Sequence, residues 1–486
     1  MRYSEDLTYN RVFLLLAVLW LAAALPRLGT RYSWDWDSSQ FDRAVEKFDV
    51  RLHQPQPPGY PLWVLAMKGL TPLLGNPNSA QVLLSLLFTA AGLLFFTSLA
   101  RELLGSEGGL AATALLAFSP LVFLYAIVPL ATSVDLFSSC AVAWFAARIW
   151  SGEPHWIVPA CLAAAITAGF RESGVALVLP LLAAALVRGL WLSRTRSYAW
   201  KAFVAGVAAG LAARLCWLVP AARLNGGLGN WHDMANAQML GTFRQTSALF
   251  GAPVVVHGKM LVEVLIYFAI ALSVLIPLSL ASRSGSGNPP AWWSPSFLGL
   301  WLTPNLIVVF LLHCGKPGYI LLSLPPLILA AVWRRNVGRL ALLGAAVGIL
   351  VSCFPYERLG KSRPSTMGYL LLRSSPRFAY ILEAGQHRMR SVLDAIPGSP
   401  SERLMISSVH RPEAPNIRTV TFDFRDLRWT DDPQVQLDAN VRTVVVLCDR
   451  LQPSPVLLER FPNLRRVSDE ASYSLWVAPV PVQPSR

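Results

Sequence analysis

Charged residues are scarce in this sequence, at 14% of 486 residues, whereas a soluble domain averages roughly 25%. Hydrophobic residues make up 54%, and they occur in long blocks instead of the short alternating runs that are typical of soluble strands. A water-soluble globule of this size is therefore excluded. The blocked pattern places the apolar residues against lipid.

Cysteine is also rare. The six cysteines form no CxxC or Cys/His metal-binding spacing, and all but Cys448 lie in or beside apolar blocks, where a cysteine is usually a small core residue. We therefore predict no disulfide framework, and the sequence indicates no metal site. A cleavable signal peptide is not recognisable, so the first apolar run, 12–24, is interpreted as an anchor that stays.

The net charge of +14 would suggest a nucleic-acid partner in a soluble protein. Here the Arg and Lys residues lie mostly in short loops between apolar blocks, and no basic stripe interleaves with aromatic residues. The excess is therefore a signal of membrane topology, and no nucleic-acid binding is predicted.

The apolar blocks predict a polytopic α-helical membrane protein, because a spanning helix needs about 20 residues to cross roughly 30 Å of hydrocarbon. We expect about eleven spans. Their predicted positions are 11–28, 80–100, 108–124, 131–149, 156–170, 173–193, 202–222, 259–282, 295–313, 318–333 and 338–355. The short apolar stretch 61–67 is expected to lie at the interface or to re-enter the membrane.

Basic residues in the short loops predict that the N-terminus lies inside. The residues that indicate this are Arg101, Arg148, Arg188, Arg194, Arg196, Lys201, Arg283, Arg334, Arg335 and Arg339. The first outer loop (29–79), the connection 223–258 and the turn 313–318 are then outside, and with an odd number of spans so is the tail. We thus predict a transmembrane domain, 1–355, and an extracytoplasmic domain, 356–486.

The tail is rich in Arg, Asp, Glu, Ser and Pro, which separates it from the spans. Residues 419–422 and 443–447 are apolar and β-branched, as expected of strands, whereas 369–372 and 378–393 have a helical pattern. The tail is therefore predicted to be a small α/β domain.

The first outer loop is long, aromatic and acidic, and it leaves through a proline-rich segment, 55–61. Its acidic motif is Trp34-Asp35-Trp36-Asp37. A carboxylate held at the membrane surface can accept a proton from an acceptor hydroxyl. The alternative is a loop of solvated acids with interfacial Trp anchors, and local chemistry does not separate the two interpretations.

Three cations, Arg171, Arg223 and Lys316, lie at predicted outer ends of spans, against the positive-inside trend. A phosphate at the interface would explain them, since it needs Arg or Lys donors; snorkelling to headgroups is the alternative for each alone. Asp135 lies inside an apolar run, at a cost of about 2.5–3.5 kcal/mol at the membrane centre. It is expected to have a task or to pair with an outer Arg.

Several motifs occur together in one order over roughly residues 10 to 335. They are Asp37 with Phe41 and Ala44, Phe48-Asp49-Val50, Pro57-Pro58-Gly59-Tyr60-Pro61, Ala168 to Arg171, Asn225-Gly226-Gly227, and Lys316-Pro317-Gly318-Tyr319 with Pro325. In these motifs the chain resembles the GT-C superfamily of membrane glycosyltransferases, especially bacterial relatives of protein O-mannosyltransferases and the lipid A aminoarabinose transferase. It departs from them at Ser38, where many members have Glu, and at Gln56, where relatives often have His.

The resemblance implies an inverting transfer of a sugar from a polyprenyl-phosphate donor to a glycan, lipid or protein hydroxyl, on the extracytoplasmic side of a bacterial inner membrane. The lipid phosphate is the leaving group, so no cofactor beyond the lipid-linked donor is expected. Asp37 is implied as the base, with Asp35 as its competitor. The residues implied at the donor phosphate are Arg171, Arg223, Lys316 and Tyr319, and those implied as acceptor-binding or supporting residues are Asp35, Asp42, His53, Tyr60 and Asp135.

Two other classes remain as alternatives. A transporter or lipid flippase would show paired broken helices in corresponding halves of the chain, and none is recognisable in the sequence. A non-catalytic scaffold that presents the tail would leave the long first loop and the outer cations without an explanation.

Overall fold

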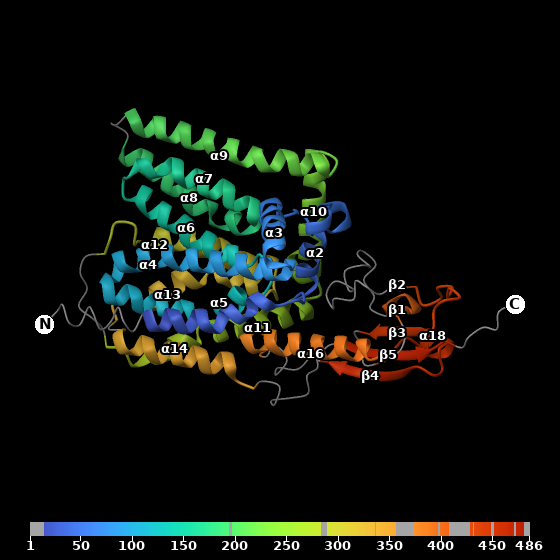
Figure 1. The fold of residues 1–486 in the computed structure, drawn as a ribbon. Helices are drawn as coiled ribbons and strands as arrows, with labels where there is room; N and C mark the ends of the chain where they lie inside the picture. Colours follow the sequence, from blue (N-terminus) through green and yellow to red (C-terminus); the bar gives the residue numbers. More distant parts are fainter. Residues whose placement is uncertain are drawn as a thin grey trace. The chain divides into compact units, whose positions relative to one another are not determined.

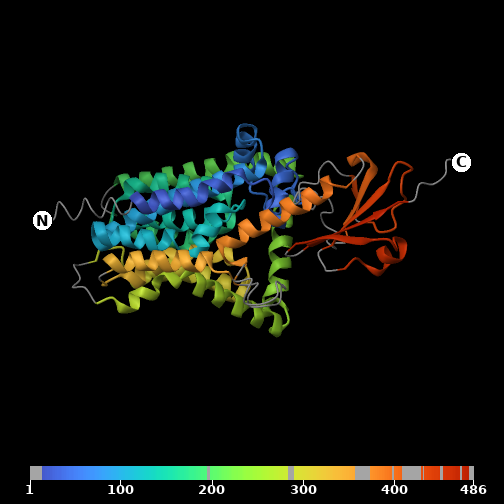
Figure 2. The same cartoon turned by 60° about the horizontal axis from the view of Figure 1, so that its bottom comes forward.

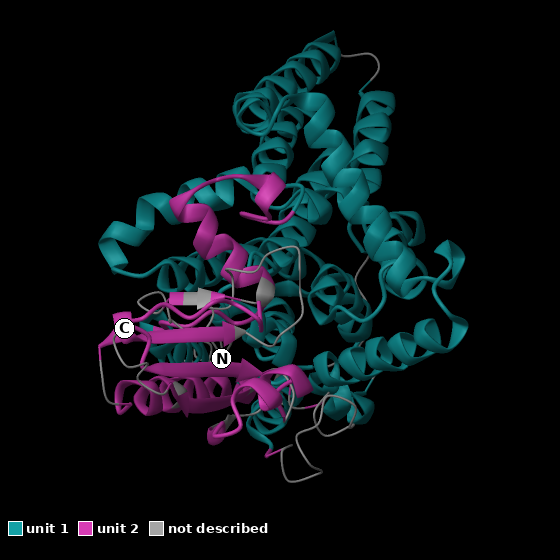
Figure 3. Cartoon of the chain, turned by 90° about the vertical axis from the view of Figure 1, so that its right-hand side faces the viewer, with its two compact units in different colours: residues 1–29, 57–354, 374–376 teal, residues 30–56, 355–373, 377–486 magenta. Residues whose placement is uncertain are grey.

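A computed structural model of the chain describes residues 14–193, 197–282, 289–335, 337–355, 371, 373–396, 399–407, 428–430, 432–448, 452–470 and 473–480. The chain divides into two compact units, coloured separately in Figure 3. Unit 1 comprises residues 1–29, 57–354 and 374–376, and unit 2 comprises residues 30–56, 355–373 and 377–486.

Unit 1 is helical throughout its described residues. It begins with a helix from Leu14 that continues as η1 (Leu25–Gly29). The next elements are α3 (Pro61–Leu74), α4 (Pro77–Ala117), α5 (Pro120–Ile127), α6 (Ser133–Trp150), η3 (Pro154–Trp156), α7 (Ile157–Phe170) and α8 (Glu172–Leu192). They are followed by α9 (Ser197–Leu224), α10 (Leu228–Thr246), η4 (Ala248–Phe250), α11 (Val254–Ala271), η5 (Ser273–Leu280), α12 (Pro295–Ile307), the π-helix η6 (Val308–Leu312), η7 (Pro317–Leu322), α13 (Leu324–Val332) and α14 (Gly338–Cys353).

The long helices of unit 1 lie side by side in Figure 1, and α6 contacts both α4 and α8 while α7 contacts α9. Helix α10 runs crosswise to them in Figure 2. By length and composition, five helices among the described residues can cross a membrane: α4, α8, α9, α11, and α12 together with η6. The polytopic membrane fold is thus confirmed, whereas the number of eleven spans stays a prediction.

The helix boundaries differ from the predicted spans at several places, among them the following two. The predicted spans 80–100 and 108–124 meet within α4, where Gly105 breaks the helix with a φ of 77°, a conformation that glycine adopts without a Cβ clash. The predicted span 318–333 is built as a short 3₁₀ helix, η7, followed by α13. Mean hydropathy depends only on which residues a stretch contains. A local break in the backbone of an apolar stretch leaves that mean unchanged, so the sequence pattern did not predict these breaks.

One end of the unit 1 bundle carries a polar network that agrees with the predicted inner side. Arg148, at the end of α6, donates from Nη2 to Glu102 at 2.7 Å, and Trp292 donates from Nε1 to the same carboxylate at 3.0 Å. These residues come from three segments that the basic-residue pattern assigns to the same side. The network ties α4, next to its break at Gly105, and the C-terminal end of α6 to the segment before α12.

Unit 2 contains a five-stranded sheet in the order β2-β1-β3-β5-β4. The strands are β1 (Arg403–Ser407), β2 (Arg428–Thr430), β3 (Thr443–Cys448), β4 (Arg465–Glu470) and β5 (Tyr473–Pro479). Strand β1 is parallel to β2 and β3, whereas β5 is antiparallel to β3 and β4. In register, Leu404 of β1 pairs with Val444, and Val445 of β3 pairs with Val477.

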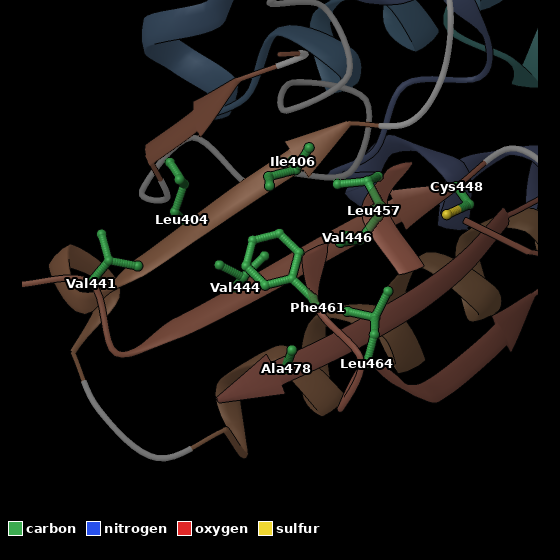
Figure 4. Close-up of a cluster of buried hydrophobic side chains, with 10 residues drawn as sticks. All are labelled: Leu404, Ile406, Val441, Val444, Val446, Cys448, Leu457, Phe461, Leu464 and Ala478. Carbon is green, nitrogen blue, oxygen red and sulfur yellow. The ribbon is translucent and has the colours of Figure 1, made fainter. Parts of the chain in front are cut away.

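Both faces of this sheet are buried, which explains why β3 is apolar at consecutive positions, since successive side chains point to opposite faces. Val445 and Leu447 face a cluster that includes Leu393 of α16 (Pro376–Asp394). Val444 and Val446 face the cluster in Figure 4, which also contains Phe461, directly after α18 (Pro455–Arg460). The 3₁₀ helix η9 (Pro400–Glu402) precedes β1.

The predicted α/β tail can be compared element by element. The strand predicted at 443–447 and the helix predicted at 378–393 are confirmed as β3 and α16. The strand predicted at 419–422 and residues 369, 370 and 372 of the short helix lie outside the described residues. The middle of the first outer loop, 30–56, is part of unit 2 together with the tail.

Candidate active site

A buried ion pair joins two of the residues singled out in the sequence. Arg171 occupies the extended link between α7 and α8, with φ −158° and ψ 101°, and Asp135 lies in the first turn of α6. The Nε atom of Arg171 donates to both carboxylate oxygens of Asp135 at 2.8 Å. The side chain of Asp135 is fully buried and that of Arg171 is 10% exposed. The expectation that Asp135 pairs with an outer Arg is therefore confirmed.

Two tyrosines flank the same guanidinium group. Its Cζ atom lies 5.4 Å from the ring centroid of Tyr319, in η7, and 5.8 Å from that of Tyr60, which precedes α3. Both distances are within the range of a cation–π contact. Three segments that are remote in the sequence thus converge on Arg171, and the predicted topology assigns all of them to the outer side of the membrane.

The hydrogen bonds of Arg171 leave part of its donor capacity unused. Within the described chain its side chain makes two hydrogen bonds, both from Nε to Asp135. A guanidinium group has five N–H donors, four of them on the two terminal nitrogens, in a fork that matches the oxygens of a phosphate. Asp135 therefore orients the group through Nε, and no hydrogen bond from its terminal nitrogens is found among the described residues.

Gly174, in the first turn of α8, makes the close approach of α8 to Asp135 possible. A Cβ atom at this position would lie 2.2 Å from Oδ1 of Asp135, so any side chain would displace the carboxylate. The sequence motifs did not include this residue. Its signal was a glycine three positions after Arg171 in an apolar helix, where small residues let helices pack closely.

The other two predicted donor-binding cations occupy exposed positions. Lys316 immediately precedes η7, three residues before Tyr319, and follows Gly315, whose φ is +86°. Arg223 lies in the last turn of α9, and its side chain makes no hydrogen bond or ion pair with the described residues. The contacts of the described residues therefore place Tyr319 at Arg171 and do not place Arg223 there.

The glycines of the Asn225-Gly226-Gly227 motif have a local structural role. Gly226 and Gly227 have φ values of 91° and 100°, and they turn the chain from α9 into α10. The side chain of Asn225 donates to the carbonyl of Ala221 at 2.8 Å. The motif therefore forms a helix-to-helix turn, a role that its resemblance to a family motif did not reveal.

In unit 2, the two competing acids of the first outer loop have different environments. Asp35 is the N-cap of α2 (Trp36–Glu46), and its Oδ1 accepts from the backbone N–H of Ser38 at 3.0 Å. Ser38 completes a capping box by accepting from the N–H of Asp35 at 2.9 Å. Asp37 lies in the first turn of the same helix and is half-buried. The structure thus gives Asp35 a structural function at the start of α2.

The remaining predicted residues of the loop support its shape. Asp42 is fully buried and accepts from the hydroxyl of Ser33 at 2.8 Å. His53 ends η2 (Val50–Leu52) in the left-handed region, with a φ of 53°. Asp49 caps η2 and forms two hydrogen bonds with the guanidinium of Arg51, at 2.9 and 3.0 Å, which lower the pKa of this carboxyl.

The fold of the chain is shared with solved structures. Its structure is similar to ArnT from Cupriavidus metallidurans bound to undecaprenyl phosphate, with a TM-score of 0.57, 13% sequence identity and coverage of 98% of each chain. It is also similar to ArnT from the same organism in the apo state, with a TM-score of 0.52, 13% identity and coverage of 97% of this chain and 98% of the other. At this identity the likeness concerns the fold.

A comparison with protein families matches part of the chain. Residues 55–217 match the family described as dolichyl-phosphate-mannose-protein mannosyltransferase, a segment that contains Tyr60, Asp135 and Arg171. Taken with the fold, this match over about a third of the chain supports a glycosyltransferase of the GT-C type. No curated protein sequence matches the chain at a significant level.

Proposed function

We propose that this protein transfers a sugar from a polyprenyl-phosphate donor to a hydroxyl group of an extracytoplasmic acceptor, with inversion at the anomeric carbon. The observation that carries the proposal is the buried Arg171, which is oriented by Asp135 and whose terminal nitrogens have no hydrogen-bond partner among the described residues. The likeness of the fold to ArnT bound to undecaprenyl phosphate supports a donor of this class.

The donor phosphate is proposed to bind at Arg171, with Lys316 and Tyr319 as further contacts and Arg223 in a supporting position. As the sugar departs, the leaving phosphate gains negative charge, and a preoriented guanidinium group stabilises that charge. The ion pair with Asp135 supplies the preorientation, because it holds Nε in a single geometry before the donor arrives.

Asp37 is proposed as the general base. The proton of the acceptor hydroxyl passes to the Asp37 carboxylate while the acceptor oxygen bonds to the anomeric carbon. The bond between that carbon and the phosphate oxygen breaks, and the polyprenyl phosphate leaves with the electron pair. Asp35 is the weaker candidate, because its carboxylate already accepts the N–H of Ser38 at the start of α2. Asp42 and His53 are proposed to support the loop, and Tyr60 to support Arg171.

Two observations argue against the transporter or flippase alternative. The match to a glycosyltransferase family covers the residues around Arg171, and that site offers a phosphate an Arg whose terminal nitrogens lack partners among the described residues. A transporter would also need a gradient to accumulate substrate, whereas group transfer proceeds without one.

The experiment offers the purified protein undecaprenyl-phosphate-linked sugars and a membrane lipid extract, with no ion gradient. Released undecaprenyl phosphate and the glycosylated product are measured by mass spectrometry. Asp37→Asn should lower turnover by roughly 10²- to 10⁴-fold, the usual effect of losing a general base, and should leave donor binding unchanged.

Asp35→Ser is the matched control, because Ser is a good N-cap and carries no carboxylate. It should retain transfer if Asp35 only caps α2. If Asp35→Ser is inactive and Asp37→Asn is active, Asp35 is the base instead of Asp37. Full activity in both variants would place the base elsewhere. Absence of any transfer in the wild-type protein would remove the proposed reaction itself.

The site is proposed to face the outside of a bacterial inner membrane. The first loop and the tail are expected on the same side, and contacts between residues 32–34 and α16 support this, since residues that touch cannot lie on opposite sides. A single cysteine at Ser401, which is exposed, would be placed in a cysteine-free background and treated with an impermeant reagent. Labelling in intact cells is expected, whereas labelling only after permeabilisation would contradict the orientation.

A further inference from the structure

Helix α16 makes contacts with two parts of unit 2 that are far apart in the sequence. Its N-terminal and central residues contact the entry segment, residues 32–34, which leads from the first apolar helix into α2. Its C-terminal residues pack on the β-sheet. The inference below rests on the proposed role of Asp37 in α2.

Three different contacts hold the entry segment against α16. The hydroxyl of Tyr32 lies 3.1 Å from Nδ1 of His387, and the two rings meet edge to face with centroids 4.8 Å apart. The ring of Trp34 meets that of Phe378 edge to face, with centroids 5.4 Å apart. Tyr32 and Phe378 are buried, whereas Trp34 is half-buried and His387 is exposed, so each contact joins a buried ring to a partner that reaches solvent.

Ser33, between Tyr32 and Trp34 in the sequence, connects the entry segment both to α16 and to α2. The side-chain amide of Gln386 donates to the carbonyl oxygen of Ser33 at 3.3 Å, and the hydroxyl of Ser33 donates to Asp42 of α2 at 2.8 Å. Asp35, which caps α2, directly follows this segment. The direction and start of α2, and with them the place of Asp37, therefore depend on where α16 holds the entry segment.

The other end of α16 is fixed to the sheet. Leu393 packs among buried residues of β1, β3 and β5. Arg403, which begins β1 and is 5% exposed, donates from its terminal nitrogens to the carbonyl oxygens of Leu393 and Ile396 at the C-terminal end of the helix. Charged donors at this end also interact favourably with the helix dipole. One helix thus ties the sheet to the entry segment.

We propose that α16 positions the part of the first outer loop that carries Asp37. In this proposal His387 and Phe378 are positioning residues that act on Asp37 through the entry segment. The sheet domain serves as the anchor of this helix. A misplacement of about 1 Å at a reacting group can cost roughly 10²-fold in rate, so a contact remote from the chemistry can control turnover.

The test compares Tyr32→Phe, His387→Leu and their double variant in the full-length protein. Turnover, affinity for undecaprenyl phosphate and melting temperature are measured for each. We expect turnover to fall by roughly tenfold or more in each single variant, with donor affinity unchanged. The double variant should be no worse than either single one, because both remove the same contact.

Two further variants separate positioning from general loss of structure. His387→Asn places an amide oxygen where Nδ1 lies, so it can accept from Tyr32 and should recover most of the turnover. Asp394→Asn removes an exposed pair with Arg390 on the same helix and should behave like the wild type, as surface pairs are worth at most about 1 kcal/mol.

Full turnover in both Tyr32→Phe and His387→Leu would overturn the inference, and so would a failure of His387→Asn to recover any activity in a stably folded protein. Either result leaves the assignment of Asp37 intact if Asp37→Asn is dead. An active Asp37→Asn enzyme would instead remove the proposed base, and the two failures are therefore distinguishable.

Discussion

Removing Arg171 alone should damage folding before it reports on donor binding. In Arg171→Gln the carboxylate of Asp135, which has no exposed surface, loses both hydrogen bonds from Nε. Removal of one partner from a buried ion pair typically costs about 3–5 kcal/mol, because the other charge stays buried without compensation. This is a large part of a stability margin of about 5–15 kcal/mol, so a lower melting temperature is expected.

The double variant Arg171→Gln/Asp135→Asn isolates the effect on the ligand. It leaves no buried charge, and the two amides can hydrogen-bond with each other, so it should be more stable than Arg171→Gln. It also lacks the cation that is proposed to hold the phosphate. A hydrogen bond to a charged group contributes about 1.5–3 kcal/mol, which corresponds to roughly a 10- to 100-fold weaker Kd for undecaprenyl phosphate.

The assay measures binding of undecaprenyl phosphate to the detergent-solubilised protein, with the melting temperature as the control for folding. The chain offers a matched control in Arg214, which pairs with Glu172 and lies over the ring of Trp217 with its Cζ atom 5.4 Å from the centroid. Arg214→Gln/Glu172→Gln should bind the lipid as the wild type does. If Arg171→Gln/Asp135→Asn melts normally and binds undecaprenyl phosphate with unchanged Kd, the phosphate does not bind at Arg171.

Two further predictions concern single contacts. Gly174→Ala should destabilise the protein by about 1–3 kcal/mol and weaken lipid binding, because the new Cβ would displace Asp135. Gly69→Ala is the control: no atom lies within 4 Å of its Cβ, so stability and lipid binding should both stay unchanged. Equal melting temperatures for the two variants would contradict this prediction. The hydrogen bonds from Arg51 lower the pKa of Asp49 in the folded state, so their stabilisation is complete above the unfolded pKa of about 3.9 and disappears as the pH falls through the folded value. The difference in melting temperature between wild type and Asp49→Asn should therefore be constant near neutral pH and shrink below about pH 3.9, and a difference that grows on acidification would show that the sign is wrong.

Local patterns in the sequence were sufficient for several conclusions. The membrane class follows from blocks of apolar residues, and β3 and α16 follow from the apolar and helical periodicities of the tail, since these properties depend on neighbouring residues only. Asp135 stood out because a charge inside an apolar helix is costly, and Arg171 stood out because it runs against the positive-inside trend.

Other features depended on contacts between remote segments. Asp135 and Arg171 are 36 positions apart, and the pairing of Arg171 with this acid, between Tyr60 and Tyr319, exists only because α3, α6, α7 and η7 pack together. Gly174 acquires its meaning from the same packing, since only the position of α6 makes a Cβ atom there impossible.

The first outer loop also has features that local sequence predicts and features that depend on remote contacts. Its acids were visible in the sequence, but the capping role of Asp35 became apparent only from the helix start at Trp36. The contact of Tyr32 with His387 spans 355 positions, and no periodicity reports which helix will meet which loop. Hydropathy and residue type determine where a chain enters lipid and where a charge needs a partner. Which partner it finds is decided by side-chain packing, because packing depends on the shapes of surfaces that come together only in the folded protein.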